Sequence, residues 1–136
     1  MIFLLDSNAI SDLIQNHPRF VARMESMSAT DEVRTASIVH GEILYGVSRL
    51  ADGKRKAILT TKVGDIFAIV RCEPVTELTA IYYAKIRADQ EKLGLSVDQN
   101  DLWIAAVAMS LDATVVSRDT DLARVAGLKV VDWTRL

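Results

Sequence analysis

Four acidic side chains stand where carboxylates could perform chemistry together. They come from four separate segments of the sequence, at Asp6, Glu42, Asp101 and Asp119. Carboxylates that cluster repel one another and shift each other's pKa values unless a divalent cation neutralises them. A ligand set of oxygens, without Cys or His, is typical of Mg²⁺ or Mn²⁺. If the fold brings these acids together, we therefore expect a Mg²⁺ or Mn²⁺ site.

Three of these acids also have an ordinary structural explanation. Asp6 and Asp119 each precede a segment with helical spacing, where Asp is a preferred N-cap residue. Asp101 lies three residues after Asp98, in the first turn of an expected helix, where an acid gains from the helix dipole. Asp98 is the better cap of that helix. Spacing alone therefore does not separate a helix cap from a metal ligand at these positions.

Glu42 is harder to explain by helix stability. Its helical neighbours at positions i−4, i+3 and i+4 are Ile38, Tyr45 and Gly46, so no cation is placed to pair with it. A partly exposed helix face remains the structural alternative for this carboxylate.

The elements that would position these acids alternate between strands and helices. Apolar runs rich in strand-forming residues predict strands at 2–5, 32–37, 72–75, 113–117 and 128–133. Capped or amphipathic segments predict helices at 7–15, from Pro18 onward, and at 38–47, 54–70, 77–94, 101–111 and 121–126. The strands are continuously apolar, which favours a parallel sheet covered by helices on both faces. Sites in such folds lie at the carboxyl edge of the sheet, where we expect three of the four acids.

Composition and charge favour one globular domain of residues 1–136. The single cysteine, Cys72, excludes an intrachain disulfide, argues against a structural zinc site and suggests a reducing cytoplasm. No apolar run is long enough to span a bilayer, so no membrane partner is expected. The net charge of −2 predicts no general attraction to nucleic acid, although residues 49–62 carry five basic residues against Asp52. That basic stretch is either a guide for RNA or a solvated helix end.

Four acid-bearing motifs and a C-terminal motif follow one another in a definite order. They are LLDSNAI with Asp6, HGEILYG with Glu42, NDLWIAAVA with Asp101, VVSRDTDL with Asp119, and GLKVVDW at the end. Together they resemble PIN-domain ribonucleases of the bacterial VapC toxin type, and the resemblance spans the whole chain. It implies a three-layer α/β/α fold with a central sheet of five parallel strands. It also implies a carboxylate site for Mg²⁺ or Mn²⁺, cleavage of RNA phosphodiester bonds, and a cognate antitoxin protein as partner.

The sequence departs from the family pattern at two positions. Ser7 stands where Thr is more common, and Leu122 stands where Phe is usual. Neither change removes an oxygen ligand. Asp121 competes with Asp119 for the place of the fourth acid, although the interval from Ser117 matches Asp119 better.

In the expected mechanism, the four acids hold one or two metal ions, which lower the pKa of a bound water that attacks phosphorus in line. The polar neighbours that would orient the carboxylates are Ser7, Asn8, Asn100, Ser117 and Asp121. Helix capping explains such residues equally well. His17 and His40 are not placed with each other or with a Ser nucleophile, so we expect neither a catalytic triad nor a metalloprotease.

Two alternative functions remain open. A phosphatase or phosphoacceptor domain would also use Asp6, but it would want a second acid at or near the position of Asn8. A catalytically inactive PIN-fold module would only bind a partner protein and would need no metal. For assembly, we expect a homodimer and an antitoxin surface on the apolar helices near Phe20 and Tyr45.

Overall fold

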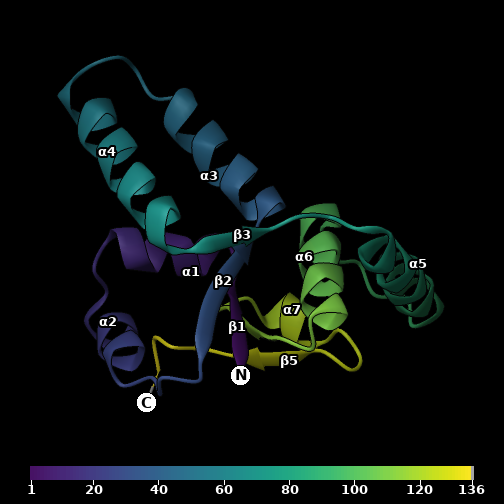
Figure 1. Cartoon of the computed structure of the whole chain (residues 1–136). Coiled ribbons are helices and arrows are strands. Elements are labelled where there is room, and N and C mark those ends of the chain that lie inside the picture. The colour runs from purple at the N-terminus through teal and green to yellow at the C-terminus, as the bar shows by residue number, and fades with distance from the viewer. Residues whose placement is uncertain (136) are drawn as a thin grey trace.

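Five strands form one parallel sheet at the centre of the protein (Figure 1). The computed structural model describes residues 1–135. The sheet order is β3–β2–β1–β4–β5, made of β1 (Ile2–Leu5), β2 (Glu32–Ala36), β3 (Arg71–Glu73), β4 (Thr114–Val116) and β5 (Lys129–Val131). Every neighbouring pair of strands is parallel, which confirms the expected sheet. β1 lies in the middle of this order, so the residue that follows it enters the centre of the carboxyl edge.

Seven helices connect the strands within residues 1–135. They are α1 (Ser7–Ile14), α2 (Pro18–Glu25), α3 (Ser37–Ser48), α4 (Lys54–Ile69), α5 (Glu77–Lys92), α6 (Gln99–Ser110) and α7 (Thr120–Ala123). Each lies where the sequence predicts a helix. α7 is the shortest, because its single turn ends at Ala123, whereas the prediction extended to residue 126.

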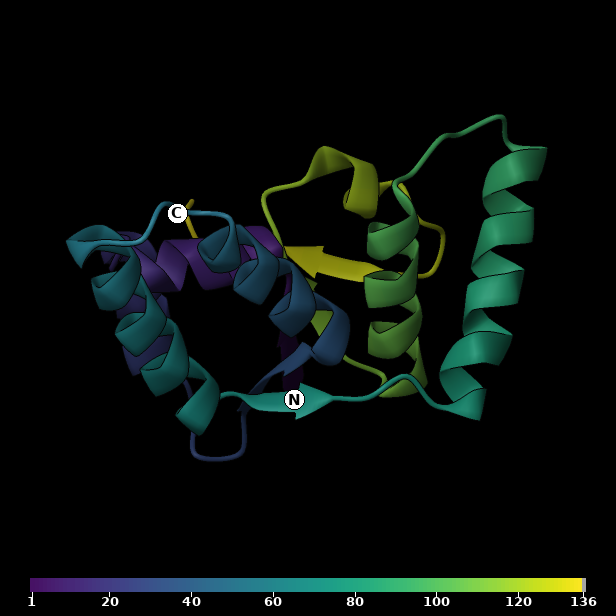
Figure 2. The same cartoon turned by 90° about the horizontal axis from the view of Figure 1, so that it is seen from above.

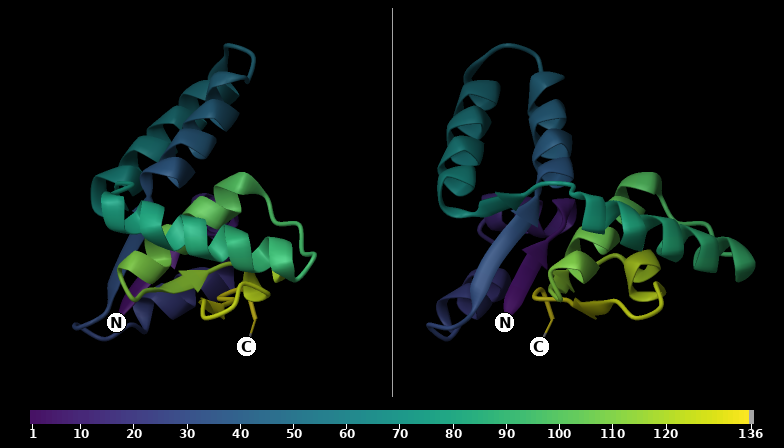
Figure 3. Two further views of the ribbon diagram at one scale, coloured as in Figure 1. Left: turned by 90° about the vertical axis from the view of Figure 1, so that its right-hand side faces the viewer. Right: turned by 45° about the vertical axis from the view of Figure 1, so that its right-hand side comes forward.

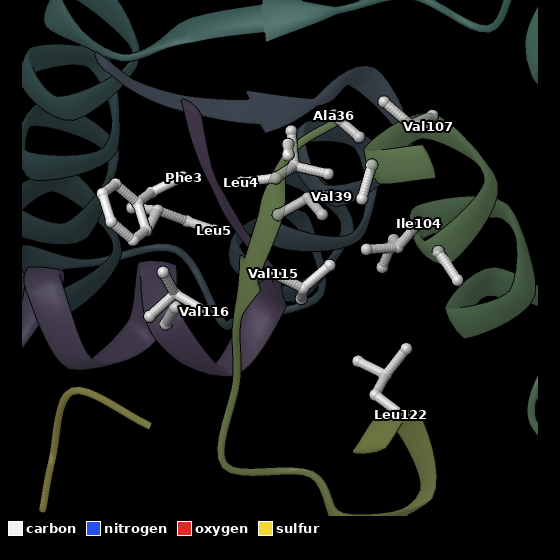
Figure 4. Close-up of a cluster of buried hydrophobic side chains, with 14 of the residues drawn as sticks. Phe3, Leu4, Leu5, Ala36, Val39, Ile104, Val107, Val115, Val116 and Leu122 are labelled. Atoms are coloured by element: carbon white, nitrogen blue, oxygen red, sulfur yellow. The ribbon is translucent and has the colours of Figure 1, made fainter. Parts of the chain in front are cut away.

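Both faces of the central strands are covered, which explains why their sequences are apolar without alternation (Figure 4). Phe3, Leu5 and Val116 point to the side where α1 lies, whereas Leu4 and Val115 point to the opposite side, toward α6. All five side chains are buried. Neighbouring residues in a strand point to opposite faces, so a strand covered on both sides needs apolar residues at every position.

α6 is the most deeply buried helix, and it lies between the sheet and α5 (Figure 2). Residues 104–108 of α6 are all buried. α5 packs along its outer side, where the rings of Tyr83 and Trp103 stack with centroids 3.7 Å apart. A helix covered on both sides needs apolar residues nearly all round, which is what the sequence DLWIAAVAMSL provides.

α3 and α4 form a hairpin that extends away from the sheet on the side where β2 ends (Figure 3). α3 begins directly after β2, so the base of the hairpin stands at the carboxyl edge of the sheet. Gly53 begins α4 with a φ of 152°, a backbone conformation that favours glycine. The loop of residues 49–53 and the first turn of α4 lie at the far end of the hairpin, so four of the five basic residues of the stretch 49–62 are there (Figure 1).

One of the two surfaces expected for assembly is not exposed. Phe20 of α2 is only 1% exposed, and its ring meets that of Trp133 with centroids 5.2 Å apart. Phe3 packs on the same Trp133 ring at 5.2 Å. The expectation of a surface at Phe20 was wrong because the C-terminal segment covers that face of α2. Tyr45 is 66% exposed, so α3 does present an aromatic side chain to solvent.

No helix formed by residues 1–135 combines the length and the apolar character needed to cross a membrane.

Candidate active site

Asp6 is a helix cap in a buried position at the carboxyl edge of the sheet. It follows β1 directly, and its Oδ1 accepts a hydrogen bond of 2.8 Å from the backbone amide of Ala9 in α1. The residue is only 2% exposed. Burial raises the pKa of Asp6 and the charge of Asp119 adds to the rise, while the Ser117 hydroxyl and the Ala9 amide oppose it. Capping is therefore real, but it does not explain why this carboxylate is placed where ionisation is disfavoured.

Glu42 reaches this edge from α3. The Ser7 hydroxyl, at the start of α1, donates a hydrogen bond of 2.7 Å to Oε1 of Glu42. The side chain is half-buried, as on a partly exposed helix face, so the hydrogen bond from Ser7 is what distinguishes it. The bond ties the residue after Asp6 to a carboxylate from a distant segment.

Asp119 is held by the loop that follows β4. Ser117 is buried, and its hydroxyl accepts a hydrogen bond of 2.9 Å from the Asp119 amide. The Asp119 Oδ1 in turn accepts from the Asp121 amide at 2.8 Å, which caps α7. The backbone amide of Ser117 donates to the carbonyl of Val131 in β5 at 3.0 Å, so the loop is fixed to the sheet.

Asp101 connects the four acids electrostatically. It lies in the first turn of α6, and the helix is capped by Asp98, as the sequence predicts. Burial raises the pKa of Asp101 to about 7, and the further causes are the charges of Asp119, Asp98, Asp6 and Glu42. The fold therefore brings the three other candidate acids close enough to Asp101 to disfavour its ionisation. The result is an excess of negative charge at one place.

The donors at this place suit a hard divalent cation, because all of them are carboxylate or hydroxyl oxygens. Burial and the charges of the neighbouring acids raise the pKa of Asp101, and such a cation would neutralise that excess of negative charge. As they stand, no three Asp, Glu, His or Cys side chains among residues 1–135 form a group that could hold a metal ion. The donor chemistry fits Mg²⁺ or Mn²⁺, and the side chains would have to draw together around the ion.

The remaining polar candidates separate into two groups. Ser7 and Ser117 contact the acids, as described above. Asn8 and Asn100 are exposed, and within residues 1–135 no hydrogen bond joins their side chains to the acids.

Asp121 forms an ion pair with Arg124 and does not contribute to the raised pKa of Asp6 or Asp101. Asp119 contributes to both, so it is the acid of this loop that faces the others.

The histidine nearest to the base of the hairpin takes part in packing. His40 stacks on Phe67 of α4 with ring centroids 3.9 Å apart, and its Nδ1 lies 3.8 Å from the Cys72 sulfur.

One residue of the basic stretch 49–62 has local partners, because the Lys56 ammonium contacts the carbonyl of Ser48 at 3.2 Å and Asp52 at 3.3 Å. Lys56 therefore belongs to a solvated helix end.

Sequence reasoning missed one ion pair beside the acids. Nε of Arg118 lies 3.0 Å from Oδ2 of Asp12, although 106 positions separate the two residues. Asp12 is only 5% exposed. The available signal was the position of Arg118 between Ser117 and Asp119, which placed a cation at the carboxyl edge.

Known proteins resemble this chain over most of its length. Residues 3–128 match the family model of the PIN domain. Ribonuclease VapC1 of Haemophilus influenzae is 29% identical over 99% of this chain and 100% of its own length. Toxin FitB of Neisseria gonorrhoeae is 34% identical over 88% of each chain.

Two solved structures cover nearly the whole chain. The crystal structure of FitAcB from Neisseria gonorrhoeae covers 100% of both chains, with a TM-score of 0.87 and 33% identity. The structure of VapBC2 from Rickettsia felis, bound to a DNA fragment from its promoter, covers 98% of this chain and 99% of its counterpart. Its TM-score is 0.88 at 27% identity. The expected fold, a parallel five-stranded sheet between helices, is shared with these proteins.

Proposed function

Since this chain belongs to the PIN-domain family, we propose that it is a metal-dependent endoribonuclease toxin that hydrolyses RNA phosphodiester bonds. We propose further that residues 1–136 act as one domain in the cytoplasm, where a cognate antitoxin holds the enzyme inactive. One observation carries the proposal: burial first, and then the charges of nearby acids that include Asp119, Asp6 and Glu42, raise the pKa of Asp101 to about 7. Relatives named as ribonucleases and toxins cover almost the whole chain, which supports the same activity.

The proposed ligands of Mg²⁺ or Mn²⁺ are the four acids, Asp6, Glu42, Asp101 and Asp119. When bound, a divalent ion there would supply a water of lowered pKa and a positive charge for the phosphate oxygens. The chain's own contribution is orientation. The Ala9 amide holds Oδ1 of Asp6, and the Ser7 hydroxyl holds Oε1 of Glu42. Carboxylates oriented in advance lose less freedom when they bind an ion.

The loop after β4 completes this arrangement. Ser117 and the Asp121 amide fix the Asp119 backbone and one of its carboxylate oxygens, Oδ1. The second carboxylate oxygen, Oδ2, is left as a donor for an ion. Asp101 has a pKa raised to about 7, so it is partly protonated near neutral pH until a cation neutralises the site. Metal binding is therefore expected to release a proton.

The proposed antitoxin surface is the groove of the α3–α4 hairpin. A cavity of about 360 Å³ there is lined mainly by apolar atoms of Leu44, Val47 and Val63, with His40 at one wall. Leu44 and Tyr45 are 47% and 66% exposed, so the hairpin presents apolar side chains to solvent. The solved structure of VapBC-5 from Mycobacterium tuberculosis is described by its name as a member of the VapBC family of toxin–antitoxin systems, which supports a protein partner.

The proposed homodimer surface lies elsewhere. Large apolar side chains are exposed between the end of α4 and the first half of α5, at Ile69, Val75, Leu78 and Ile81. Large apolar side chains that are exposed within one short stretch of the chain support self-association there. Light scattering at micromolar concentration should therefore give the mass of a dimer, and a monomer would contradict this part of the proposal.

The test of the enzymatic proposal is cleavage of RNA by the purified protein. Total RNA should be cut in Mg²⁺ or Mn²⁺, left intact in EDTA, and cut again when the metal is restored. Full cleavage in chelator would contradict the metal mechanism. Calorimetric titration with Mn²⁺ separates the alternative of an inactive interaction module, because only a catalytic site needs to bind the ion stoichiometrically. No heat of binding together with no cleavage would favour that module.

A further inference from the structure

A cavity at the carboxyl edge of the sheet is lined by one of the four acids, Asp119. It has a volume of about 180 Å³ and lies beyond β4, toward β5. Its lining includes Ser117, Asp119, Thr120, Asp132, Arg118 and Arg135. One wall therefore belongs to the candidate active site, and two arginines stand on the others.

Arg118 is held in place by a buried acid. Its Nε contacts Oδ2 of Asp12 at 3.0 Å, and the Asp12 side chain is 8% exposed, whereas that of Arg118 is 47% exposed. Among residues 1–135, this ion pair is the one contact recorded for the guanidinium, so the N–H donors of both Nη groups are left for a ligand. A charged side chain fixed at one nitrogen and open at the other two is suited to bind an anion.

Arg135 supplies a second cation at the same cavity. Its Nε lies 3.2 Å from Oδ2 of Asp132, and its side chain is 81% exposed. The acids of the active site repel the phosphates of RNA, except where a metal ion intervenes. A phosphate on either side of the one being cut therefore needs a cation of its own. Within the cavity, Arg118 and Arg135 are the residues that carry such a charge.

We propose that this cavity binds a phosphate of single-stranded RNA next to the scissile one, with Arg118 as a positioning residue fixed by Asp12 and Arg135 as its second cation. The inference rests on the proposed function, because it assigns part of the substrate path of the same site. It also moves the RNA contacts from the basic stretch 49–62 to the loop after β4. The competing explanation is that Arg118 only neutralises Asp12.

The experiment measures RNA binding without cleavage. A short fluorescein-labelled oligouridylate is titrated in EDTA, and anisotropy gives the association constant at several salt concentrations. Single-stranded RNA loses about 0.7 in the slope of log K against log salt for each phosphate contact that is removed. Arg118→Gln should therefore bind several-fold more weakly, with a slope shallower by about 0.7. Arg118→Lys should keep the slope of wild type and lose only part of the affinity, because the charge remains.

Two further variants test the competing explanation, in which Arg118 only neutralises Asp12. The double variant Asp12→Asn with Arg118→Gln leaves no buried charge unpaired, so it should fold normally and still bind RNA weakly with the shallower slope. Arg124→Gln is the matched control, because Arg124 is 51% exposed and pairs with Asp121 outside the cavity lining. Its affinity and slope should equal those of wild type.

Wild-type affinity and slope in the double variant would overturn the inference, and so would a wild type that binds no RNA at any salt concentration. These outcomes are distinguishable from failure of the proposed function. Cleavage is assayed separately in Mg²⁺, and an inactive wild type that nevertheless binds RNA through Arg118 would refute the ribonuclease while leaving the cavity assignment intact.

Discussion

The carboxyl edge of the sheet and the far end of the α3–α4 hairpin contain the two conspicuous groups of charge in this chain, and they are built differently. At the edge, carboxylates are buried or half-buried, come from segments far apart, and are held by hydrogen bonds such as Ser7 to Glu42. At the hairpin, the charges are neighbours in sequence and largely exposed, and Lys56 is satisfied by Asp52. Exposed ion pairs contribute little to stability or specificity. Charge that the fold assembles from distant segments therefore points to function more strongly than charge that is merely adjacent in sequence.

The largest expected difference between these regions is in catalysis. Asp101→Asn removes a proposed ligand and should reduce RNA cleavage by about 1000-fold or more, since a bound ion contributes several kcal/mol to transition-state stabilisation. The matched change at the hairpin, Lys54→Gln with Arg55→Gln, should leave cleavage within about twofold. Initial rates in Mg²⁺ at constant ionic strength measure both. A hairpin variant as impaired as Asp101→Asn would break the comparison.

A sharper form of the same test lies within the loop after β4. Asp119 acts on the charge state of Asp6 and Asp101, whereas Asp121 pairs with Arg124. Asp119→Asn should therefore reduce cleavage by about 100-fold or more, because it removes the charge of a proposed ligand, and Asp121→Asn should reduce it little. Equal losses in the two variants would show that both acids serve the ion.

Much of this organisation could be predicted from the sequence. The parts that could not be predicted have one physical cause in common. The strand at 2–5 and the buried helix at 101–111 were predictable because their apolar patterns are local. The hydrogen bond from Ser7 to Glu42 and the ion pair of Arg118 with Asp12 depend on strand order, which no local pattern encodes. A surface near Phe20 was expected because its partner in packing, Trp133, lies at the other end of the chain, where no local pattern connects the two residues.

The acids of the carboxyl edge, unlike the charges of the hairpin, should make the stability of the metal-free protein depend on pH. The pKa of Asp101 is raised from 3.8 to about 7, so the folded state holds its proton over a range where the unfolded chain releases it. The free energy of unfolding therefore falls as pH rises from about 4 to about 7, because the folded state binds more protons there. Burial raises the pKa of Asp6 in the same direction. Denaturant melts in EDTA across this range should show the fall, and Asp101→Asn should flatten it.

The smallest expected effect concerns the stability of Asp6→Asn, and it separates the two roles of this residue. Asn caps a helix about as well as Asp, so the acceptor for the Ala9 amide is retained and the cap costs almost nothing. The variant also removes a charge that burial and Asp119 make unfavourable, so the metal-free protein should be as stable as wild type or slightly more stable.

Added Mn²⁺ should then distinguish the two proteins. An ion that binds only the folded state stabilises it by RT ln(1 + [L]/Kd), so wild type should melt at a higher temperature as Mn²⁺ increases. Asp6→Asn should lose most of that gain together with RNA cleavage, because it has kept the cap and lost a ligand charge. A variant that still gains the full metal shift and still cuts RNA would show that Asp6 only caps α1. The functional charge of the carboxyl edge would then have to lie with the other three acids.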